Sequence, residues 1–258
     1  MSDRSPQSPP FPQPLDLVVC DVDGCLTPET SDPFDLAKLQ RVAEYNHRAL
    51  TTGGSPPVTV CTGRPEPFAE AMCRLLGNRE IPCIAENGAW LYFPATNEYS
   101  RDPSITAEHL EIVHEARIEL ERQFAPRGVT QQPGKTASVT LYHRDSDFLR
   151  RILPEVQETA ERRGWPFRVT MTWLYINCDL EFVSKATGIQ RLFEATGLDP
   201  RQSLGIGDTV SDLPMREILG AVASPANATD DIKSVADYVS PFEEVEGVLD
   251  ILRLATER

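Results

Sequence analysis

The sequence lacks a hydrophobic run long enough to cross a membrane, and its first 14 residues are rich in proline and serine without an apolar signal core. It also lacks a CxxC pair, although it contains six cysteines. These absences predict a cytoplasmic protein whose cysteines are reduced, free and mostly buried in apolar strands. We expect residues 1–14 to form a flexible tail.

Basic residues are scarce relative to acidic ones, because 25 Lys and Arg face 39 Asp and Glu, for a formal net charge of -14. An acidic surface opposes attraction to nucleic acid and to anionic membranes. We therefore expect neither of these partners, and we leave a homodimer open.

Histidine is also scarce, and two of the four histidines, His109 and His114, lie five residues apart on a predicted helix. Side chains at this spacing point about 140° apart and cannot easily share one zinc ion. A solvated helix is the better interpretation.

Short apolar runs alternate with helical patterns along both ends of the chain. This alternation predicts an α/β fold, a doubly wound parallel sheet of the Rossmann-like hydrolase type, formed by residues 15–88 and 181–258. Strands are expected at Leu15–Cys20, Pro56–Cys61, Ile81–Ala85, Ser203–Gly207, Ala221–Ala223 and residues 237–240. Helices are expected at residues 34–50, 66–76, 185–196, 230–236 and 245–255, with another from about Ser211.

The regular alternation of strand and helix patterns stops over residues 89–180, which we expect to form an inserted α+β domain. Ile105–Phe124 and Phe148–Arg163 have helical spacing, and Pro154 either opens or kinks the second helix. Runs of β-branched and aromatic residues predict three or four strands beside them, within residues 136–143 and 167–180. An insert of about 90 residues is large enough to be a small domain.

Two carboxylates, Asp21 and Asp23, follow the first predicted strand in the sequence DVDG. Gly24 allows the backbone to turn sharply beside them. One acid of such a pair can attack an electrophile while the other moves protons. Taken alone the motif is weak, because acidic turns after strands are common.

Further chemical groups follow in a fixed order. Thr62, Gly63 and Arg64 supply a hydroxyl, an unhindered N–H and a guanidinium after the second strand. Lys185 begins a predicted helix, where the helix dipole disfavours a cation. Asp208 and Asp212 follow the strand Ser203–Gly207. Because ligands of doubly wound sheets bind beyond the carboxyl ends of the strands, we expect these groups to meet in one site.

In this order, DVDG, TGR, a lysine and GDTVSDLPM resemble the four motifs of the haloacid dehalogenase superfamily. The insert resembles the C2-type cap of its Cof-like branch. ENGA and the ending PANATDDIKSVADYVSPFEEVEGV look like the archaeal-type phosphoglycolate phosphatases. Sucrose-phosphate and mannosyl-3-phosphoglycerate phosphatases share the same plan. Position 25, often Thr in such enzymes, is Cys25, which weakens a supporting hydrogen bond.

The resemblance implies a phosphatase that hydrolyses a small phosphorylated metabolite, 2-phosphoglycolate or a sugar phosphate, through an aspartyl-phosphate. Asp21 would be the nucleophile and Asp23 the general acid and base. Mg²⁺ would be held by Asp21, the backbone carbonyl of Asp23, Asp208 and Asp212, with Asp212 bound directly or through another group. The groups that bind the substrate phosphate would be Thr62, Gly63, Arg64 and Lys185.

Two alternatives stay open. A phosphomutase or phosphotransferase could use the same two acids to pass the phosphoryl group to a sugar hydroxyl. A receiver-like signalling module also places clustered Asp, a Thr and a Lys around Mg²⁺ on a doubly wound sheet. Its acids precede the lysine, however, whereas Asp208 and Asp212 follow Lys185 here.

Overall fold

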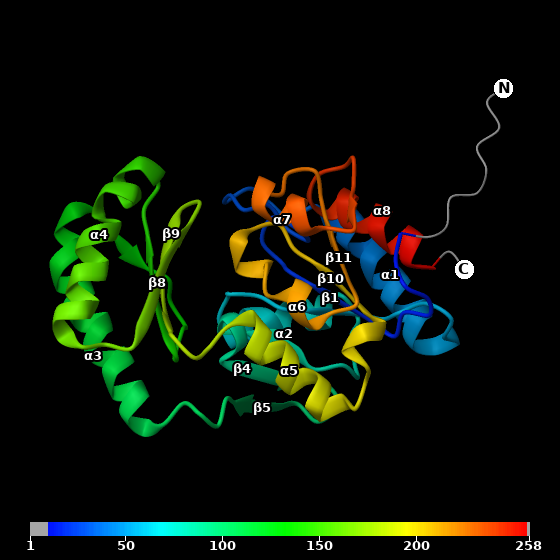
Figure 1. Ribbon diagram of the computed structural model, residues 1–258, viewed down its shortest axis with the longest axis horizontal. Helices are drawn as coiled ribbons and strands as arrows, with labels where there is room; N and C mark the ends of the chain where they lie inside the picture. Colours follow the sequence, from blue (N-terminus) through cyan, green and yellow to red (C-terminus); the bar gives the residue numbers. More distant parts are fainter. Residues whose placement is uncertain (1–9, 257–258) are drawn as a thin grey trace.

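The structure is a computed structural model that describes residues 10–256. Figure 1 shows two bodies joined by two chain crossings, a core that carries both ends of the described chain and a smaller cap. Residues 1–9 of the predicted tail lie outside the described residues. Within the remainder of that segment, Phe11 is buried and its ring packs edge-on against Tyr238, 6.2 Å between centroids.

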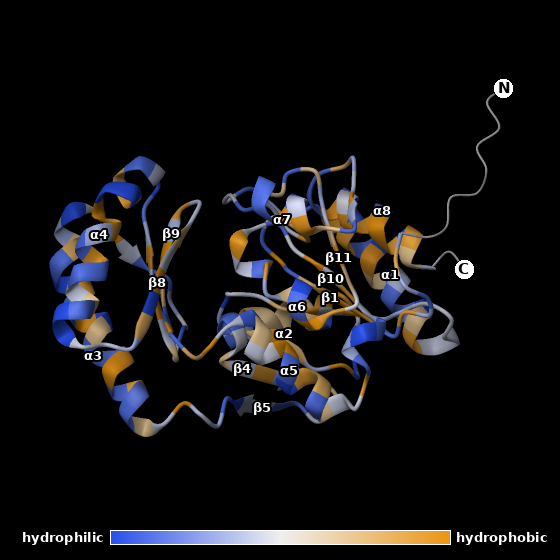
Figure 2. Ribbon diagram, in the orientation of Figure 1, coloured by the Kyte–Doolittle hydropathy of each residue, from blue (hydrophilic) through white to orange (hydrophobic). Residues whose placement is uncertain are grey.

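The core is built on a parallel sheet of strand order β12-β11-β10-β1-β2. The strands are β1 (Leu17–Cys20), β2 (Val58–Val60), β10 (Ser203–Ile206), β11 (Ala221–Ser224) and β12 (Tyr238–Val239). β1, β2, β10 and β11 are short and fully buried, as expected for strands covered on both faces, whereas the edge strand β12 is partly exposed. Figure 2 shows their hydrophobic colouring at the centre of the core. The prediction of an α/β doubly wound parallel sheet is confirmed.

Helices cover both faces of this sheet. They are α1 (Leu36–Thr52), α2 (Glu66–Leu75), α5 (Lys185–Thr196), α6 (Met215–Ile218), α7 (Asp230–Val235) and α8 (Glu244–Thr256). Alternate residues of β1 enter different clusters: Val18 packs with α1, α2 and α8, while Leu17 packs with α5, α6 and α7. The helix expected from about Ser211 is a 3₁₀ turn (Val210–Asp212) followed, after Pro214, by the short α6.

A second, antiparallel sheet of order β3-β4-β5 extends the core and was not predicted in full. Its strands are β3 (Cys83–Ala85), β4 (Trp90–Phe93) and β5 (Glu98–Arg101), and a bridge from Ile84 to Cys61 joins it to the parallel sheet. Tyr92 and Leu91 are buried in the two core clusters. The boundary expected at residue 89 is therefore too early, and we place the start of the cap after Arg101.

The cap contains a four-stranded antiparallel sheet of order β6-β7-β9-β8. Its strands are β6 (Thr130–Gln131), β7 (Ser138–Tyr142), β8 (Phe167–Thr172) and β9 (Tyr175–Leu180), and its helices are α3 (Ala107–Phe124) and α4 (Ser146–Arg163). Both helices lie on the face of the sheet that is turned away from the core (Figure 1). Pro154 lies within α4, so it does not open that helix.

Three 3₁₀ turns complete the elements, at Glu86–Gly88, Ala125–Arg127 and Pro200–Gln202. The six cysteines are buried and free, as predicted. Within residues 10–256, every helix is too short or too polar to span a bilayer.

Candidate active site

The predicted acids meet where the strand order of the core sheet reverses. From β1 the chain runs outward to β2 and β3, and it returns to β10, on the other side of β1, before continuing to β11 and β12. Asp21 follows β1 and Asp208 follows β10, and the last residues of these strands, Cys20 and Ile206, are paired in register. A crevice at such a switch point is the usual ligand site of a doubly wound sheet.

Gly24 allows Asp208 to approach the loop that follows β1. Its φ is +77°, and a Cβ placed on it would lie 2.0 Å from Oδ2 of Asp208. A side chain at this position would displace the carboxylate and strain the backbone. The glycine of DVDG therefore brings two acids that are far apart in the sequence together.

Lys185 joins two of the acids from the N-terminus of α5. Its Nζ lies 2.6 Å from Oδ2 of Asp21 and 2.6 Å from Oδ1 of Asp212. Burial alone would lower the pKa of Lys185, but the two carboxylates outweigh it and raise the pKa above its usual value. Burial raises the pKa of Asp21 to about 7, although Lys185 acts in the opposite direction.

The acid cluster carries more negative charge than Lys185 balances. Asp21, Asp208 and Asp212 offer carboxylate oxygens that all lie within 4.8 Å of one another. Burial, and then the charges of Asp21 and Asp212, raise the pKa of Asp208 to about 9. Three carboxylates around one ammonium favour an additional cation, and an all-oxygen donor set suits Mg²⁺. The residues therefore fit a hard divalent cation.

The carboxylate of Asp212 is held in place by backbone N–H groups of the turn that contains it. Its Oδ2 accepts hydrogen bonds from the backbone N–H groups of Asp208 (3.1 Å) and Thr209 (3.2 Å), while Oδ1 accepts from Lys185. The side chain is fully buried and does not line the cavity. Asp212 thus fixes the positions of Asp208 and Lys185.

The TGR segment follows β2, which is paired with β1, so it lies beside the loop that carries Asp21 and Asp23. Both Nε and Nη2 of Arg64 donate to the Asp23 carboxylate, at 2.8 and 2.6 Å. Gly63 and Arg64 line the cavity, whereas Thr62 is fully buried and its hydroxyl accepts from the Arg64 N–H. Thr62 therefore shapes the loop, and Arg64, expected at the substrate phosphate, is paired with Asp23.

Glu29 is an acidic residue of the cavity that was not predicted. It lies in the loop after β1 and lines the cavity beside Asp21 and Asp23. Burial, followed by the charges of Asp23 and Asp21, raises its pKa to about 8. Its sequence context, TPET, has no feature that separates it from a surface acid.

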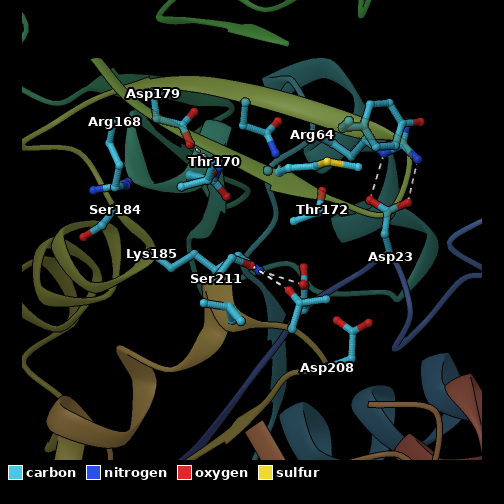
Figure 3. A pocket seen from close by; sticks show the side chains of 18 of the residues that line it. Asp23, Arg64, Arg168, Thr170, Thr172, Asp179, Ser184, Lys185, Asp208 and Ser211 are labelled. Carbon is cyan, nitrogen blue, oxygen red and sulfur yellow. Dashed lines mark hydrogen bonds and ion pairs between the residues drawn. The ribbon is translucent and has the colours of Figure 1, made fainter. Parts of the chain in front are cut away.

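The cap sheet forms the opposite wall of the cavity, which has a volume of about 350 Å³. Polar residues alternate with apolar ones along β7, β8 and β9, so the polar set faces the core and the apolar set faces α3 and α4. Figure 3 shows Arg168, Thr170 and Asp179 across the cavity from Lys185 and Asp208. Register places polar residues in rows, of which Ser138–Asp179–Arg168 and Thr140–Asn177–Thr170 are two. Period-two alternation in YINCDL could have identified them.

Two residues of the ENGA segment connect the core to the cap. Glu86 is buried, and its carboxylate accepts from the N–H groups of Thr136 (2.8 Å) and Ala137 (2.9 Å). Nδ2 of Asn87 donates to Oδ2 of Asp179 at 2.9 Å. Burial raises the pKa of Glu86 to about 7. This joint fixes the cap over the acids.

The histidine pair does not form a metal site in the described part of the chain. Nδ1 of His109 accepts from the Thr106 N–H at the start of α3, and its ring contacts that of Phe182 at a tilt of 51°, with 4.9 Å between centroids. His109 therefore has a structural role.

Comparison with known proteins identifies relatives over almost the whole chain. Residues 155–252 match the haloacid dehalogenase-like hydrolase family. A protein of Methanopyrus kandleri named phosphoglycolate phosphatase is 30% identical over 243 residues, which are 93% of this chain and 97% of that protein. A phosphoglycolate phosphatase of Methanospirillum hungatei is 26% identical over 92% of this chain and 95% of its own length.

Solved structures share the arrangement of core and cap. Protein 0175 of Thermoplasma acidophilum superposes with a TM-score of 0.71 at 22% identity, covering 93% of this chain and 99% of that one. The phosphatase BT1666 of Bacteroides thetaiotaomicron superposes with a TM-score of 0.63 at 17% identity and full coverage of both chains. At these identities the superpositions establish the fold alone.

Proposed function

We propose that this chain, a phosphatase that belongs to the haloacid dehalogenase-like hydrolases, hydrolyses a small phosphomonoester through a phosphoryl group carried on Asp21. The observation that carries this proposal is the buried Asp21 carboxylate, held between Lys185 and Asp208 at the switch point and covered by the cap. A carboxylate so placed can attack a phosphoryl group in line and later release it to water.

The orientation of Asp21 is fixed before any substrate arrives. Its Oδ1 accepts from the Val22 N–H at 2.7 Å and its Oδ2 is paired with Lys185. Lys185 would bind a phosphoryl oxygen as well as the nucleophile, which lowers the repulsion between two anions. Mg²⁺ held by Asp21, Asp208 and Asp212, with the backbone carbonyl of Asp23, would supply the remaining positive charge.

Asp23 is the candidate general acid and base. In the first step Asp21 would form a bond to phosphorus as the ester P–O bond breaks, and the leaving oxygen would take a proton from Asp23. In the second step Asp23 would accept a proton from the water that attacks phosphorus, which frees Asp21 and inorganic phosphate. Arg64 donates to both oxygens of Asp23 in this structure, so at least one of these hydrogen bonds would be exchanged for a bond to the leaving oxygen when Asp23 donates its proton.

The favoured substrate is 2-phosphoglycolate, because two relatives that match nearly the whole chain carry the name phosphoglycolate phosphatase. The cavity volume of about 350 Å³ supports a small ester rather than a macromolecule.

A phosphate-release screen over small phosphoesters with Mg²⁺ tests this function. We expect 2-phosphoglycolate to give the highest kcat/KM and the Asp21→Asn variant to be inactive on every ester. Turnover by Asp21→Asn at the wild-type rate would contradict the proposal. Transfer of the phosphoryl group to a sugar hydroxyl, without free phosphate, would instead identify a phosphotransferase.

A further inference from the structure

The cap contains a buried lysine with no carboxylate partner. Lys135 is only 3% exposed, it lines the cavity, and its Nζ donates to Oγ1 of Thr140 at 2.6 Å. Within residues 10–256, no carboxylate oxygen lies within 4.0 Å of this ammonium. Lys185, equally buried in the core, has two carboxylates at 2.6 Å. A buried ammonium with one neutral partner is costly, which indicates that an anion completes the site.

The neighbours of Lys135 orient a second donor. Because Thr140 accepts from Lys135, its own hydroxyl proton is directed to Oδ1 of Asn177, 2.9 Å away. This contact leaves the Asn177 NH₂ group without a protein acceptor among the described residues, and Asn177 lines the cavity. Lys135 and Asn177 therefore offer free N–H groups to one region.

The charged groups that line the cap wall favour the binding of one further anion. Lys135 and Arg168 are cations, and the Arg168 guanidinium donates to the backbone carbonyls of Glu181 and Val183 rather than to an acid. Asp179 is the carboxylate of this wall, and its Oδ2 already accepts from Asn87. Among the residues that line this wall, two cations face one carboxylate, and the buried Glu86 carboxylate is bonded to the N–H groups of Thr136 and Ala137. A further carboxylate in the cavity would therefore give Lys135 a direct charged partner.

We propose that Lys135 and Asn177 bind the carboxylate of the substrate, at the end opposite the phosphoryl group, and so select phosphorylated hydroxy acids. This inference rests on the proposed function. The same wall would repel an ester whose far end is an ammonium group. Burial lowers the pKa of Lys135, whereas Asp179 and Glu86 raise it, so an added carboxylate would hold the ammonium form.

The test compares three esters of similar size that differ at the far end: 2-phosphoglycolate, ethyl phosphate and phosphoethanolamine. Lys135→Met keeps the side-chain length without the charge. Asn177→Asp keeps the acceptor for Thr140 but adds a negative charge. Arg150→Met, which removes a cation from the exposed side of α4, is the matched control.

For the wild type we expect kcat/KM to fall in the order 2-phosphoglycolate, ethyl phosphate, phosphoethanolamine. Both cap variants should lower the ratio of kcat/KM for 2-phosphoglycolate over ethyl phosphate by about 30-fold or more, mainly through KM. Lys135→Met removes the charge that pairs with the substrate carboxylate, and Asn177→Asp adds a charge that repels it. Arg150→Met should keep the wild-type ratio. Melting curves identify a cap variant that fails to fold. In that case the cap variant that does fold tests the subsite.

Three results would overturn the subsite. An unchanged ratio in either folded variant, Lys135→Met or Asn177→Asp, would show that these two residues do not form a carboxylate site together. A wild type that hydrolyses ethyl phosphate as well as 2-phosphoglycolate would also remove the subsite while leaving the proposed function intact. Release of phosphate from none of the three esters would remove the proposed function and the subsite together.

Discussion

The two walls of the cavity are charged in opposite ways and built in opposite ways. The core wall gathers Asp21, Asp23, Glu29 and Asp208 on loops that follow strands. The cap wall presents Lys135 and other polar groups from a sheet and the loop before it. Loops at strand ends can crowd acids around a cation, whereas a pleated sheet spaces its side chains evenly. The comparison assigns phosphoryl chemistry to the core wall and substrate selection to the cap wall.

The largest loss of activity is expected when the nucleophile of the core wall is replaced. Asp21→Asn should lower kcat at least about 10⁴-fold, equally for 2-phosphoglycolate and ethyl phosphate, because chemistry at phosphorus is common to both esters. Steady-state phosphate release measures this loss. A loss confined to the carboxylated ester would place Asp21 in selection instead.

The second-largest loss of activity is expected when Lys185, the buried cation of the core wall, is replaced. Lys185→Met leaves Asp21 and Asp212 without their partner. We expect kcat/KM to fall by about 10²- to 10³-fold for both esters, since a preorganised charge at the phosphoryl oxygens is lost. The contrast with Lys135→Met, which should affect one ester, is the sharpest test of the division. Equal behaviour of the two lysine variants would contradict it.

Removal of the metal should make the stability of the protein depend on pH, because the acids of the core wall lie close together. The folded pKa of Asp208, about 9, lies above its ordinary value of 3.8. The metal-free folded state therefore binds more protons than the unfolded state between these values, and its stability falls as pH rises through this window. Melting temperatures of chelated protein at pH 5 to 9 should decrease, and Mg²⁺ at pH 8 should restore several degrees. Asp208→Asn should flatten the trend, and a metal-free melting temperature that rises with pH would refute the argument.

The smallest expected effect concerns the joint between the walls. Glu86→Gln keeps the shape of the side chain but loses one acceptor atom for the N–H groups of Thr136 and Ala137. The free energy of unfolding should fall by about 1–3 kcal/mol, and KM should rise severalfold for both esters alike. Denaturant unfolding measures the first effect. Glu111→Gln on the exposed face of α3 should leave both quantities near the wild type, and a similar fall there would remove the special role of Glu86.

The sequence predicts the core wall better than the cap wall, for a physical reason. Strand-to-loop junctions such as DVDG and GDTVSD place several polar groups within a few adjacent positions, and parallel strands bring those positions to one edge. Oδ2 of Asp208 lies 2.0 Å from a notional Cβ on Gly24, which illustrates how close the two loops come. The Arg64–Asp23 pair could not be foreseen, because it depends on side-chain directions rather than on loop positions.

The cap wall depends on register between strands, which local sequence does not determine. Asn177 reaches Thr140 only because β9 pairs with β7 at that position, and Lys135 joins them from a loop. The hairpin of β4 and β5 was missed for a related reason. It belongs to the core through pairing with β3, although its position after ENGA suggested the start of the insert.

The central claim is that Asp21 carries the phosphoryl group during turnover. Acid quenching of the enzyme in the first turnovers with 2-phosphoglycolate and Mg²⁺, followed by digestion and mass spectrometry, tests it directly. We predict one phosphoryl group on the peptide that contains Asp21, removed by hydroxylamine and absent from Asp21→Asn. A phosphoryl group on another residue would contradict the account, as would rapid hydrolysis by the Asp21→Asn variant.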